Sequence, residues 1–444
     1  MNRRPKIAVI GAGWAGLSAA LTLYRQADVT VFEASKQAGG RARGLSASAK
    51  HGYLSDLDNG QHLLIGAYDS ILRILAQVGV AEADAFVRQP LTWVMHDGMQ
   101  MKCPKLPAPL HLIVGILRAK GLSRGDKIAL LKGAKRLQAL AQMAPKHDLS
   151  VADWLRQQGT SLHVIHQFWQ PLVWATLNTP LAMASVKTLA AVVQEGVMST
   201  RAHSDFLIPR ASLHDVFVAP VLKYLIKHQV IISLGQRVQS IEAKGPGQVW
   251  VDGERFDQVI VCAAPYHART LLANLNAVDF EQYVDGLSYG SIATVYLHYD
   301  RPVVLPEHMI GLADGTAQWL VQRGALDFNS HEVAAVISCA QQYEGWDQQT
   351  WIHKIHADVL QVCPDLNEPL EAQVIIEKRG TILASVGRTP QAYWQMNELG
   401  VYVAGDYLHP IYPATLEGAV ESAQRVAAQC LLDWSESDAK TITR

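Results

Sequence analysis

The sequence predicts an α/β protein in which a parallel, doubly wound domain is interrupted by an α+β domain. Three observations predict this fold class. A strand, a glycine-rich turn, a helix and a second strand follow one another in residues 6–33, and another strand and helix with glycines lie at 399–420. The long segments between them alternate between helical and strand-like patterns. The 444 residues are enough for two or three domains.

Composition narrows the class of protein. Apolar residues make up 49% of the chain and charged residues only 18%, so the chain either buries much of itself or presents apolar surface to a partner. A formal net charge of −1 argues against a general nucleic-acid binder. The five cysteines are scattered and form no Cys-x-x-Cys pair. We therefore expect reduced thiols in a cytoplasmic protein, with neither a disulfide framework nor a metal site.

The first unit has the pattern of a dinucleotide site rather than of a signal peptide. A strand at 6–10 leads into a G-x-G-x-x-G motif, a helix of small residues follows, and a strand at 29–33 ends in Glu33. Glycine permits the tight turn, the approach of the backbone to a pyrophosphate, and close helix packing. Glu33 can accept hydrogen bonds from an adenosine ribose. The predicted contacts with the dinucleotide are Gly11, Gly13, Trp14, Ala15, Gly16, Glu33 and Ala34.

Two further segments resemble the flavin amine oxidase and phytoene desaturase superfamily. One is Gly39-Gly40-Arg41, and the other combines a strand ending in Gly405-Asp406 with the helix start at 413–420. The resemblance implies FAD as the cofactor. It further implies a Rossmann-like FAD-binding domain of the glutathione-reductase/amine-oxidase type, with an inserted α+β substrate domain that contains a mixed sheet.

The same resemblance assigns roles to particular residues. Gly40 and Arg41 would approach the pyrophosphate or the flavin, and Asp406 after Gly405 would bind the ribityl chain. Thr415 and Leu416 would contact the isoalloxazine, where the helix dipole favours the negative charge of reduced flavin. Further FAD contacts are expected from Gly60, Gln61 and Val238, the last through its backbone to adenine.

The domain boundaries follow from these motifs. We expect a discontinuous FAD-binding domain formed by 1–75, 205–265 and 390–444, and a substrate-binding domain formed by 76–204 and 266–389. No second G-x-G-x-x-G occurs, so the sequence predicts no NAD(P)H site. If the flavin is reduced during the reaction, the electrons should come from an external reductant or electron-donor protein, or from the substrate.

Three stretches are similar to the bacterial hydroxysqualene dehydroxylases, which are also called squalene-associated FAD-dependent desaturases. They are 57–68 with Asn59-Gly60-Gln61-His62, 168–180 with Asn178-Thr179-Pro180, and 405–418. Ser422-Ala423 departs from the Ser-Gly that is common in the superfamily. The resemblance implies removal of the hydroxyl from a C30 isoprenoid lipid by hydride from reduced FAD, in squalene and hopanoid biosynthesis. Contacts with the upstream squalene-pathway synthases are a further expectation.

This chemistry requires a proton donor near the flavin. His62 is the first candidate and His409 the second, and a structural histidine is the alternative interpretation of each. Other functions stay open: a carotenoid (phytoene-type) desaturase, a flavin amine oxidase, or a non-catalytic flavin-bound scaffold. Amine oxidation would favour an aromatic cage before the last helix, where Tyr407 and Tyr412 lie.

The segment 102–136 concentrates positive charge. It has nine lysines and arginines against Asp126 alone, a net charge of +8, which leaves −9 on the rest of the chain. The apolar run at 106–117 is too short to span about 30 Å of hydrocarbon, but it suits an anionic interface. Either the segment docks on the inner face of the cytoplasmic membrane as a peripheral contact, or it is a solvated basic helix pair over a core-facing run.

Overall fold

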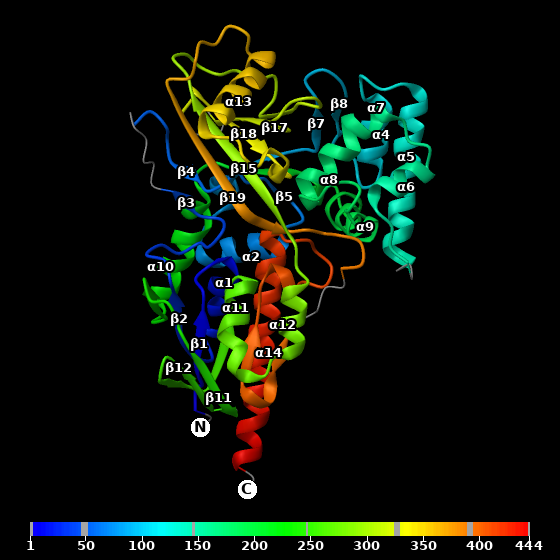
Figure 1. Cartoon of the computed structure of the whole chain (residues 1–444). Coiled ribbons are helices and arrows are strands. Elements are labelled where there is room, and N and C mark those ends of the chain that lie inside the picture. The colour runs from blue at the N-terminus through cyan, green and yellow to red at the C-terminus, as the bar shows by residue number, and fades with distance from the viewer. Residues whose placement is uncertain are drawn as a thin grey trace.

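In the computed structural model the chain forms two lobes, and both termini lie at the far end of the lower lobe (Figure 1). The structure describes residues 3–45, 52–143, 147–245, 247–323, 329–388 and 394–442. A six-stranded sheet organises the lower lobe and a five-stranded sheet the upper lobe. Across the described ranges, no helix has the length and apolarity needed to cross a membrane.

The six-stranded sheet is mixed, because it is parallel except at one edge. Its order is β10-β2-β1-β14-β21-β20, and only β20 pairs antiparallel with its neighbour. The central strands β1 and β14 are buried on both faces, as expected for parallel strands covered by helices. Their carboxyl ends meet at one edge, where ligands bind in such sheets. The strands are β1 (Lys6–Ile10), β2 (Asp28–Glu33), β10 (Ile231–Leu234), β14 (Gln258–Val261), β20 (Gln395–Met396) and β21 (Val401–Val403).

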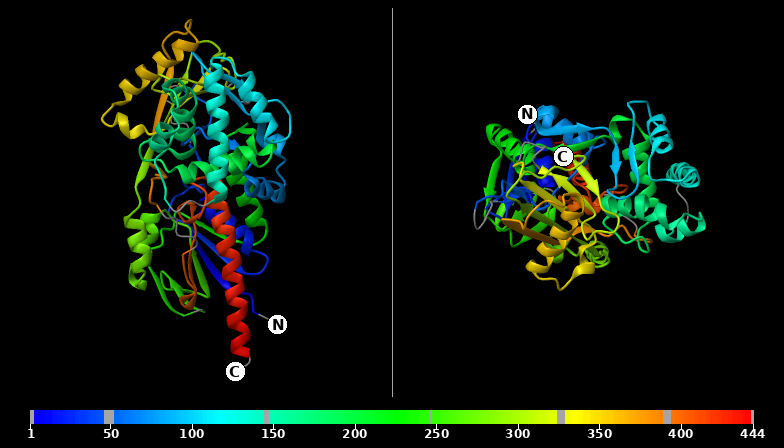
Figure 2. Two further views of the ribbon diagram at one scale, coloured as in Figure 1. Left: turned by 90° about the vertical axis from the view of Figure 1, so that its right-hand side faces the viewer. Right: turned by 90° about the horizontal axis from the view of Figure 1, so that it is seen from above.

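Helices pack on both faces of this sheet. The core on one face contains α1, α2, α10 and α14, which pack against Ile7 and Val9 of β1. The core on the other face contains α11, α12 and a β11-β12-β13 sheet. α14 runs down the length of the lower lobe (Figure 2). These elements are α1 (Trp14–Leu23), α2 (Asp69–Val78), α10 (Ala219–Lys227), α11 (Pro265–Leu272), α12 (Val278–Asp285), α14 (Leu416–Ile442), β11 (Ile241–Gly245), β12 (Gln248–Val251) and β13 (Glu254–Phe256).

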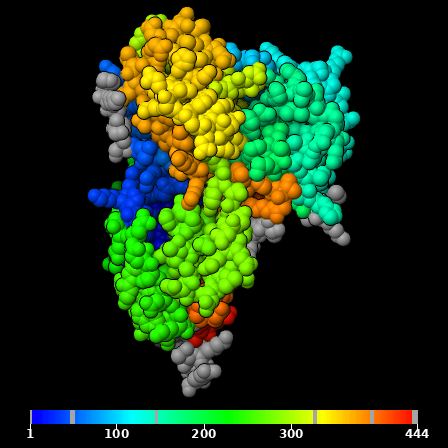
Figure 3. Space-filling model, in the orientation of Figure 1, coloured from blue at the N-terminus to red at the C-terminus, as the bar shows by residue number. Residues whose placement is uncertain are grey.

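The position of α11 and α12 bears on the predicted domain boundary at residue 265. Leu272 of α11 and Phe280 of α12 are fully buried in the same core as Val259 and Val401 of the lower sheet. On the face shown in Figure 3, this region lies below the upper lobe. We therefore propose that the border between the two domains lies after residue 285. The other predicted boundaries stay predictions.

The upper sheet has the order β16-β17-β18-β15-β19, and its strand pairs are antiparallel. A parallel bridge between Met95 and Gly311 joins the β7-β8 hairpin to its edge, which adds a parallel contact. α13 covers one side. The elements are β15 (Tyr289–His298), β16 (Met309–Gly311), β17 (Trp319–Gln322), β18 (Glu332–Ile337), β19 (Glu371–Ile382), β7 (Thr92–Val94), β8 (Gln100–Lys102) and α13 (Gln348–Val362).

A helical unit packs against the other side of the upper sheet. Its core is rich in tryptophan and includes Trp154 and Trp169, whose rings meet edge to face at 5.4 Å. Small sheets connect the lobes. The elements are α4 (Leu110–Arg118), α5 (Arg124–Met143), α6 (Val151–Gln157), α7 (Leu162–Val164), α8 (Gln170–Leu177), α9 (Val186–Val193), π-helices at Ile165–Trp169, Gln194–Met198 and His214–Val218, α3 (Glu82–Ala85), β3 (Gly44–Leu45), β4 (Leu57–Asp58), β5 (Leu64–Ile65), β6 (Phe86–Gln89) and β9 (Phe206–Pro209).

Candidate active site

A pocket of about 890 Å³ is lined by residues of both lobes. Every residue that the sequence predicts for the site lines it, except Gly16 and His409. The fold thus brings together segments from the beginning, middle and end of the chain. The predicted residues on the lining are Gly11, Gly13, Trp14, Ala15, Glu33, Ala34, Gly40, Arg41, Gly60, Gln61, His62, Val238, Gly405, Asp406, Thr415 and Leu416.

The glycine motif forms the turn between β1 and α1. Gly11 has a φ of +108°, and a Cβ on Gly16 would lie 1.8 Å from the carbonyl oxygen of Gly11, so both positions require glycine. No side chain in the described chain caps the N-terminus of α1, and its first turn contains no acid. Trp14 and Ala15 are buried there. A buried, uncapped helix N-terminus on a pocket suits a phosphate group.

Glu33 lies at the carboxyl end of β2, and its carboxylate is held in place from both sides. Oε2 accepts the amide of Ala12 at 2.8 Å, and Oε1 accepts the amide of Ser35 at 2.8 Å. The side chain stands on the pocket lining with Val238. This position suits a carboxylate that accepts hydrogen bonds from ribose hydroxyls.

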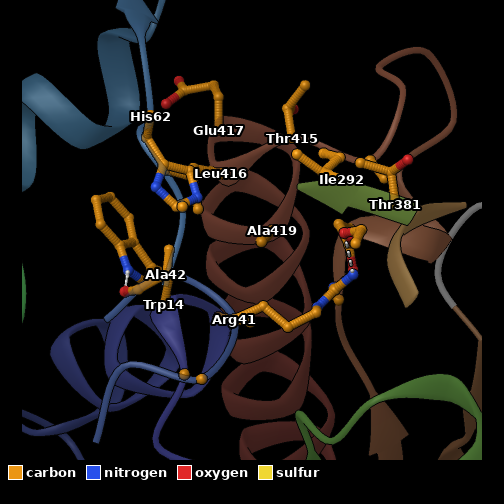
Figure 4. Close-up of a pocket in the computed structure, with 18 of the residues that line it drawn as sticks. Trp14, Arg41, Ala42, His62, Ile292, Thr381, Thr415, Leu416, Glu417 and Ala419 are labelled. Atoms are coloured by element: carbon orange, nitrogen blue, oxygen red, sulfur yellow. Dashed lines mark hydrogen bonds and ion pairs between the residues drawn. The ribbon is translucent and has the colours of Figure 1, made fainter. Parts of the chain in front are cut away.

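Arg41 joins the second glycine loop to the C-terminal strand. Its Nη2 donates to Oδ1 of Asp406 at 2.6 Å, and its Nη1 donates to the carbonyl oxygen of Gly380 at 3.2 Å (Figure 4). Gly40 has a φ of +63°, and a Cβ there would lie 3.2 Å from Cα of Gly13. The two glycine loops therefore approach each other closely, and both line the pocket.

The segment Asn59–His62 crosses the pocket without regular structure. Asn59 bonds the loop that carries Arg41, since its Nδ2 donates to the Arg41 carbonyl oxygen at 2.6 Å. The amide of Gln61 donates to Oγ1 of Thr294 at 3.3 Å, and its side-chain oxygen accepts a hydrogen bond from Arg323 at 3.2 Å. This segment thus contacts both lobes.

His62 lies on the lining at the side where α14 begins (Figure 4). Burial lowers its pKa to about 4, against a smaller opposing effect of the Gly60 carbonyl. Its Nδ1 is buried and has no hydrogen-bond partner among the described residues. The imidazole is therefore neutral at pH 7, and its predicted role as the proton donor stays a prediction.

The start of α14 presents two side chains of different character. Oγ1 of Thr415 accepts the amide of Gly418 at 3.0 Å, and so caps the helix. Glu417 is 1% exposed, lines the pocket and accepts the amides of Ser70 and Ile71 at 2.6 and 3.1 Å, at the beginning of α2. Burial raises its pKa to about 7. Near neutral pH this carboxyl is partly protonated.

His409, the second candidate for the proton donor, does not lie on the pocket lining that this role requires. Its Nδ1 accepts the amides of Ile411 and Tyr412 at 3.2 and 2.8 Å, and its Nε2 lies 3.0 Å from Oε2 of Glu421. The ring stacks on Tyr412 at 4.3 Å. Both ring nitrogens are thus engaged in holding the turn before α14, and the structure does not bring His409 to the pocket lining.

Beyond these residues the pocket continues as an apolar chamber in the upper lobe. One wall comes from the upper sheet and the other from α8 and α9. Asn178 ties the walls together, because its Nδ2 donates to Oγ1 of Thr381 at 2.9 Å and its Oδ1 accepts the amide of Cys339 at 2.7 Å. The apolar lining residues include Trp93, Leu172, Trp174, Val192, Phe206, Ile208, Met309, Trp319, Val321 and Val336.

The site contains residues that sequence reasoning does not single out. Asn59 belongs to a recognised motif, but only the fold shows that it bonds the Arg41 loop. Arg323 and Glu332 lie in segments without any motif, and their contact with Gln61 and its neighbours depends on the packing of the two lobes. Glu417 adjoins the predicted Leu416, and its burial is a consequence of tertiary packing.

The residues present fit a flavin dinucleotide. The uncapped N-terminus of α1 suits the pyrophosphate, and Glu33 suits the adenosine ribose. Asp406, the ribityl partner that the resemblance implies, lies on the same lining. A Cβ on Gly13 would meet only Cα of Gly40, at 3.7 Å, so the space in front of this glycine is open to a ligand.

Comparison with known proteins supports this description. Residues 14–431 match the family described as flavin containing amine oxidoreductase. The chain is 25% identical to a hydroxysqualene dehydroxylase of Zymomonas mobilis, over 94% of this chain and 97% of that protein. It is also 25% identical to a hydroxysqualene dehydroxylase of Rhodopseudomonas palustris, over 94% and 96%. A zeta-carotene desaturase of Capsicum annuum is 24% identical, over 66% of this chain and 54% of that protein.

Solved structures share the fold. Wild-type putrescine oxidase bound to putrescine aligns with a TM-score of 0.70 at 15% identity, over 97% of this chain and 99% of that one. An oxidoreductase from Methanosarcina mazei aligns with a TM-score of 0.73 at 16% identity, over 95% and 100%.

Proposed function

Because the chain belongs to the family of flavin-containing amine oxidoreductases, we propose that it is an FAD-dependent enzyme that converts hydroxysqualene to squalene. The observation that carries this proposal is the extent of the similarity. Relatives named hydroxysqualene dehydroxylase align over 94% of this chain and 96–97% of their own length. The zeta-carotene desaturase of Capsicum annuum matches only 54% of its length. The alignment with the dehydroxylases thus includes the segments that form the apolar chamber.

In the proposed reaction a carbon–oxygen bond breaks and a carbon–hydrogen bond forms at the same carbon. Reduced FAD, when bound, supplies the hydride, and an external two-electron reductant restores it. The hydroxyl takes up one proton and leaves as water. The chain itself must hold a C30 hydrocarbon in a dry space, and the aromatic and aliphatic walls of the chamber suit that task.

The proton must come from a group on the lining. His62 is the predicted donor, but its lowered pKa keeps it neutral at pH 7. The pKa of Glu417, raised by burial to about 7, is better matched to proton donation at neutral pH. We infer that Glu417, on the lining where α14 begins, donates the proton, with the neutral His62 on the same side of the pocket.

The direct test uses the FAD-loaded protein, hydroxysqualene and dithionite under anaerobic conditions, with squalene detected by mass spectrometry. Squalene should form in proportion to the reductant consumed. Zeta-carotene with an electron acceptor, and putrescine with oxygen, test the desaturase and amine oxidase alternatives in parallel. If no squalene forms and either alternative substrate is turned over, the proposal is wrong and the protein is a desaturase or an amine oxidase instead.

We also propose that α4 and α5 form a peripheral contact with an anionic membrane. α4 buries Leu112 and Ile116 in the core, while Leu110 and Leu117 on its other side are each 52% exposed. Ile128 of α5 is also 52% exposed. The exposed basic side chains around them are Lys105, Arg118, Lys120, Arg124, Lys132, Lys135 and Arg136. The buried side of α4 is thus the core-facing run, and its exposed side is the proposed membrane contact.

A further inference from the structure

Residues 53–62, of which Gly60, Gln61 and His62 line the pocket, are held mainly by side chains of the upper lobe. Arg323, directly after β17, is 2% exposed and reaches this segment with two of its nitrogens. Its Nη2 donates to the carbonyl oxygen of Asp56 at 2.7 Å, and its Nη1 donates to Oε1 of Gln61 at 3.2 Å. The contact at Gln61 lies one residue before His62.

A buried carboxylate fixes Arg323 in turn. Its Nε donates to Oε2 of Glu332 at 2.8 Å, and Glu332 has no solvent exposure. Oε1 of Glu332 accepts the amide of Ser55 at 2.7 Å, and Oε2 accepts the Ser55 hydroxyl at 2.6 Å. The guanidinium also stands over the ring of Tyr296 at 5.0 Å. An arginine with this many fixed partners is a rigid template, because its planar fork loses little freedom on binding.

The same segment is fastened to the lower lobe at the other side. Asn59 bonds the backbone of Arg41 and Arg43, and the carboxylate of Asp58 accepts the amide of Leu213 at 2.9 Å. The segment is therefore anchored to the cofactor-facing loop through Asn59 and to the upper lobe through Arg323. A side chain that holds a loop over a site in this way influences the site without touching the ligand.

We propose that Arg323 is a positioning residue, which sets Gln61 and His62 at the flavin-facing part of the pocket through its contacts with Gln61, Asp56 and Glu332. The inference rests on the proposed function only in taking FAD as the ligand. It makes the placement of the flavin-facing segment depend on the upper sheet, whose strands β17 and β18 also line the apolar chamber through Val321 and Val336.

The test compares Arg323→Lys with Arg88→Lys in the FAD-loaded protein and in the protein without FAD. Arg88 is the control, because it is another arginine with several fixed partners, although its side chain is 28% exposed. Its partners are Glu82, Asp205 and the Ala202 carbonyl, and none of these lies in residues 53–62. Lysine keeps a charge near Glu332 but cannot reach all of the arginine's partners.

In Arg323→Lys, the amides of Ser55 and Gln61 should exchange hydrogen about tenfold faster, as expected when a charge-assisted hydrogen bond is lost. The visible circular dichroism of bound FAD should change as well. Arg88→Lys should leave both signals as in the wild type. A second variant, Arg323→Met with Glu332→Gln, removes both buried charges and is used if Arg323→Lys does not fold. In this variant only the Gln61 amide is read, because Glu332 itself accepts the Ser55 amide.

Unchanged exchange at Ser55 and Gln61 in the folded Arg323 variants would overturn the proposal, as would an equal change in Arg88→Lys. Neither readout uses turnover. If the wild type makes no squalene while the exchange and dichroism respond as expected, the proposed function fails and the positioning role stands.

Discussion

The side-chain amide of Asn59 donates to the carbonyl oxygen of Arg41 at 2.6 Å, and its oxygen accepts the amide of Arg43 at 3.1 Å. The Asn59 side chain thus joins the loop Gly39–Arg43 to the segment that contains Gln61 and His62 through two hydrogen bonds. Because both of these segments line the pocket, their relative position decides how a flavin dinucleotide can be held.

Replacing Asn59 by alanine should weaken FAD binding. The variant loses two backbone contacts, each with a net value of about 1 kcal/mol, so the Kd of FAD should rise roughly tenfold to thirtyfold. Quenching of flavin fluorescence on binding measures the Kd. Asn367→Ala is the control, because this exposed asparagine bonds Asp300 at the surface. An unchanged Kd in Asn59→Ala would mean that the loop keeps its position without this side chain.

Alanine at two glycines of the same motif should have different consequences. At Gly16 a Cβ would lie 1.8 Å from a backbone oxygen, so Gly16→Ala should destabilise the protein itself by several kcal/mol. At Gly13 the Cβ would meet only Cα of Gly40 at 3.7 Å, so Gly13→Ala should fold normally. It should nevertheless lose most FAD affinity, because its methyl group occupies the space in front of α1.

Denaturant unfolding of the protein without FAD and a separate FAD titration distinguish the two effects. Full FAD affinity in Gly13→Ala would show that the pyrophosphate does not approach this position. Wild-type stability in Gly16→Ala would contradict the close packing of α1 on β1.

The sequence predicts the cofactor motifs of this site but not the contacts that depend on the packing of the two lobes. The fold class and the FAD cofactor are confirmed, because the glycine turn, Glu33 and the Gly405-Asp406 strand end are local patterns whose geometry dictates their residues. The Arg323–Glu332 pair could not be predicted, since nothing in 319–332 marks an arginine that reaches a segment more than 250 residues earlier. The same holds for His409, whose sequence position suggests a site residue but whose two nitrogens are used by the turn at 411–412 and by Glu421.

His62 should make stability depend on pH in a defined window. Burial lowers its pKa from 6.5 to about 4 in the folded protein, so between these values the unfolded chain binds more protons than the folded one. The free energy of unfolding must therefore rise with pH across this window. His62→Gln lacks this contribution. Between pH 7.5 and pH 5 the wild type should lose about 2 kcal/mol more than the variant.

Urea unfolding of both proteins at the two pH values, with FAD in excess, measures this difference. The contribution of the other histidines to the pH dependence is the same in both proteins, so it cancels in the comparison. Equal losses in wild type and variant would show that His62 can be protonated in the folded state, and would restore it as a cationic proton donor.

Binding to anionic membranes should depend on the basic and apolar side of α4 and α5. Lys120, Arg124 and Lys132 are exposed there, whereas Nζ of Lys127 bonds the Leu117 carbonyl at 3.0 Å at the end of α4. The variant should therefore reverse the first three and spare Lys127. Each basic residue near an anionic surface contributes about 1 kcal/mol, so the triple change to glutamate should lower partitioning by at least a hundredfold.

The control reverses Lys223, Lys227 and Lys244, which are exposed in the lower lobe and give the same change in net charge. Co-sedimentation with vesicles of phosphatidylglycerol and, separately, of phosphatidylcholine measures binding. Leu110→Ser with Leu117→Ser should weaken binding to both lipids, because it removes apolar area rather than charge. If the control triple variant loses as much binding as the α4–α5 variant, the effect is one of net charge alone, and this surface has no special role at the membrane.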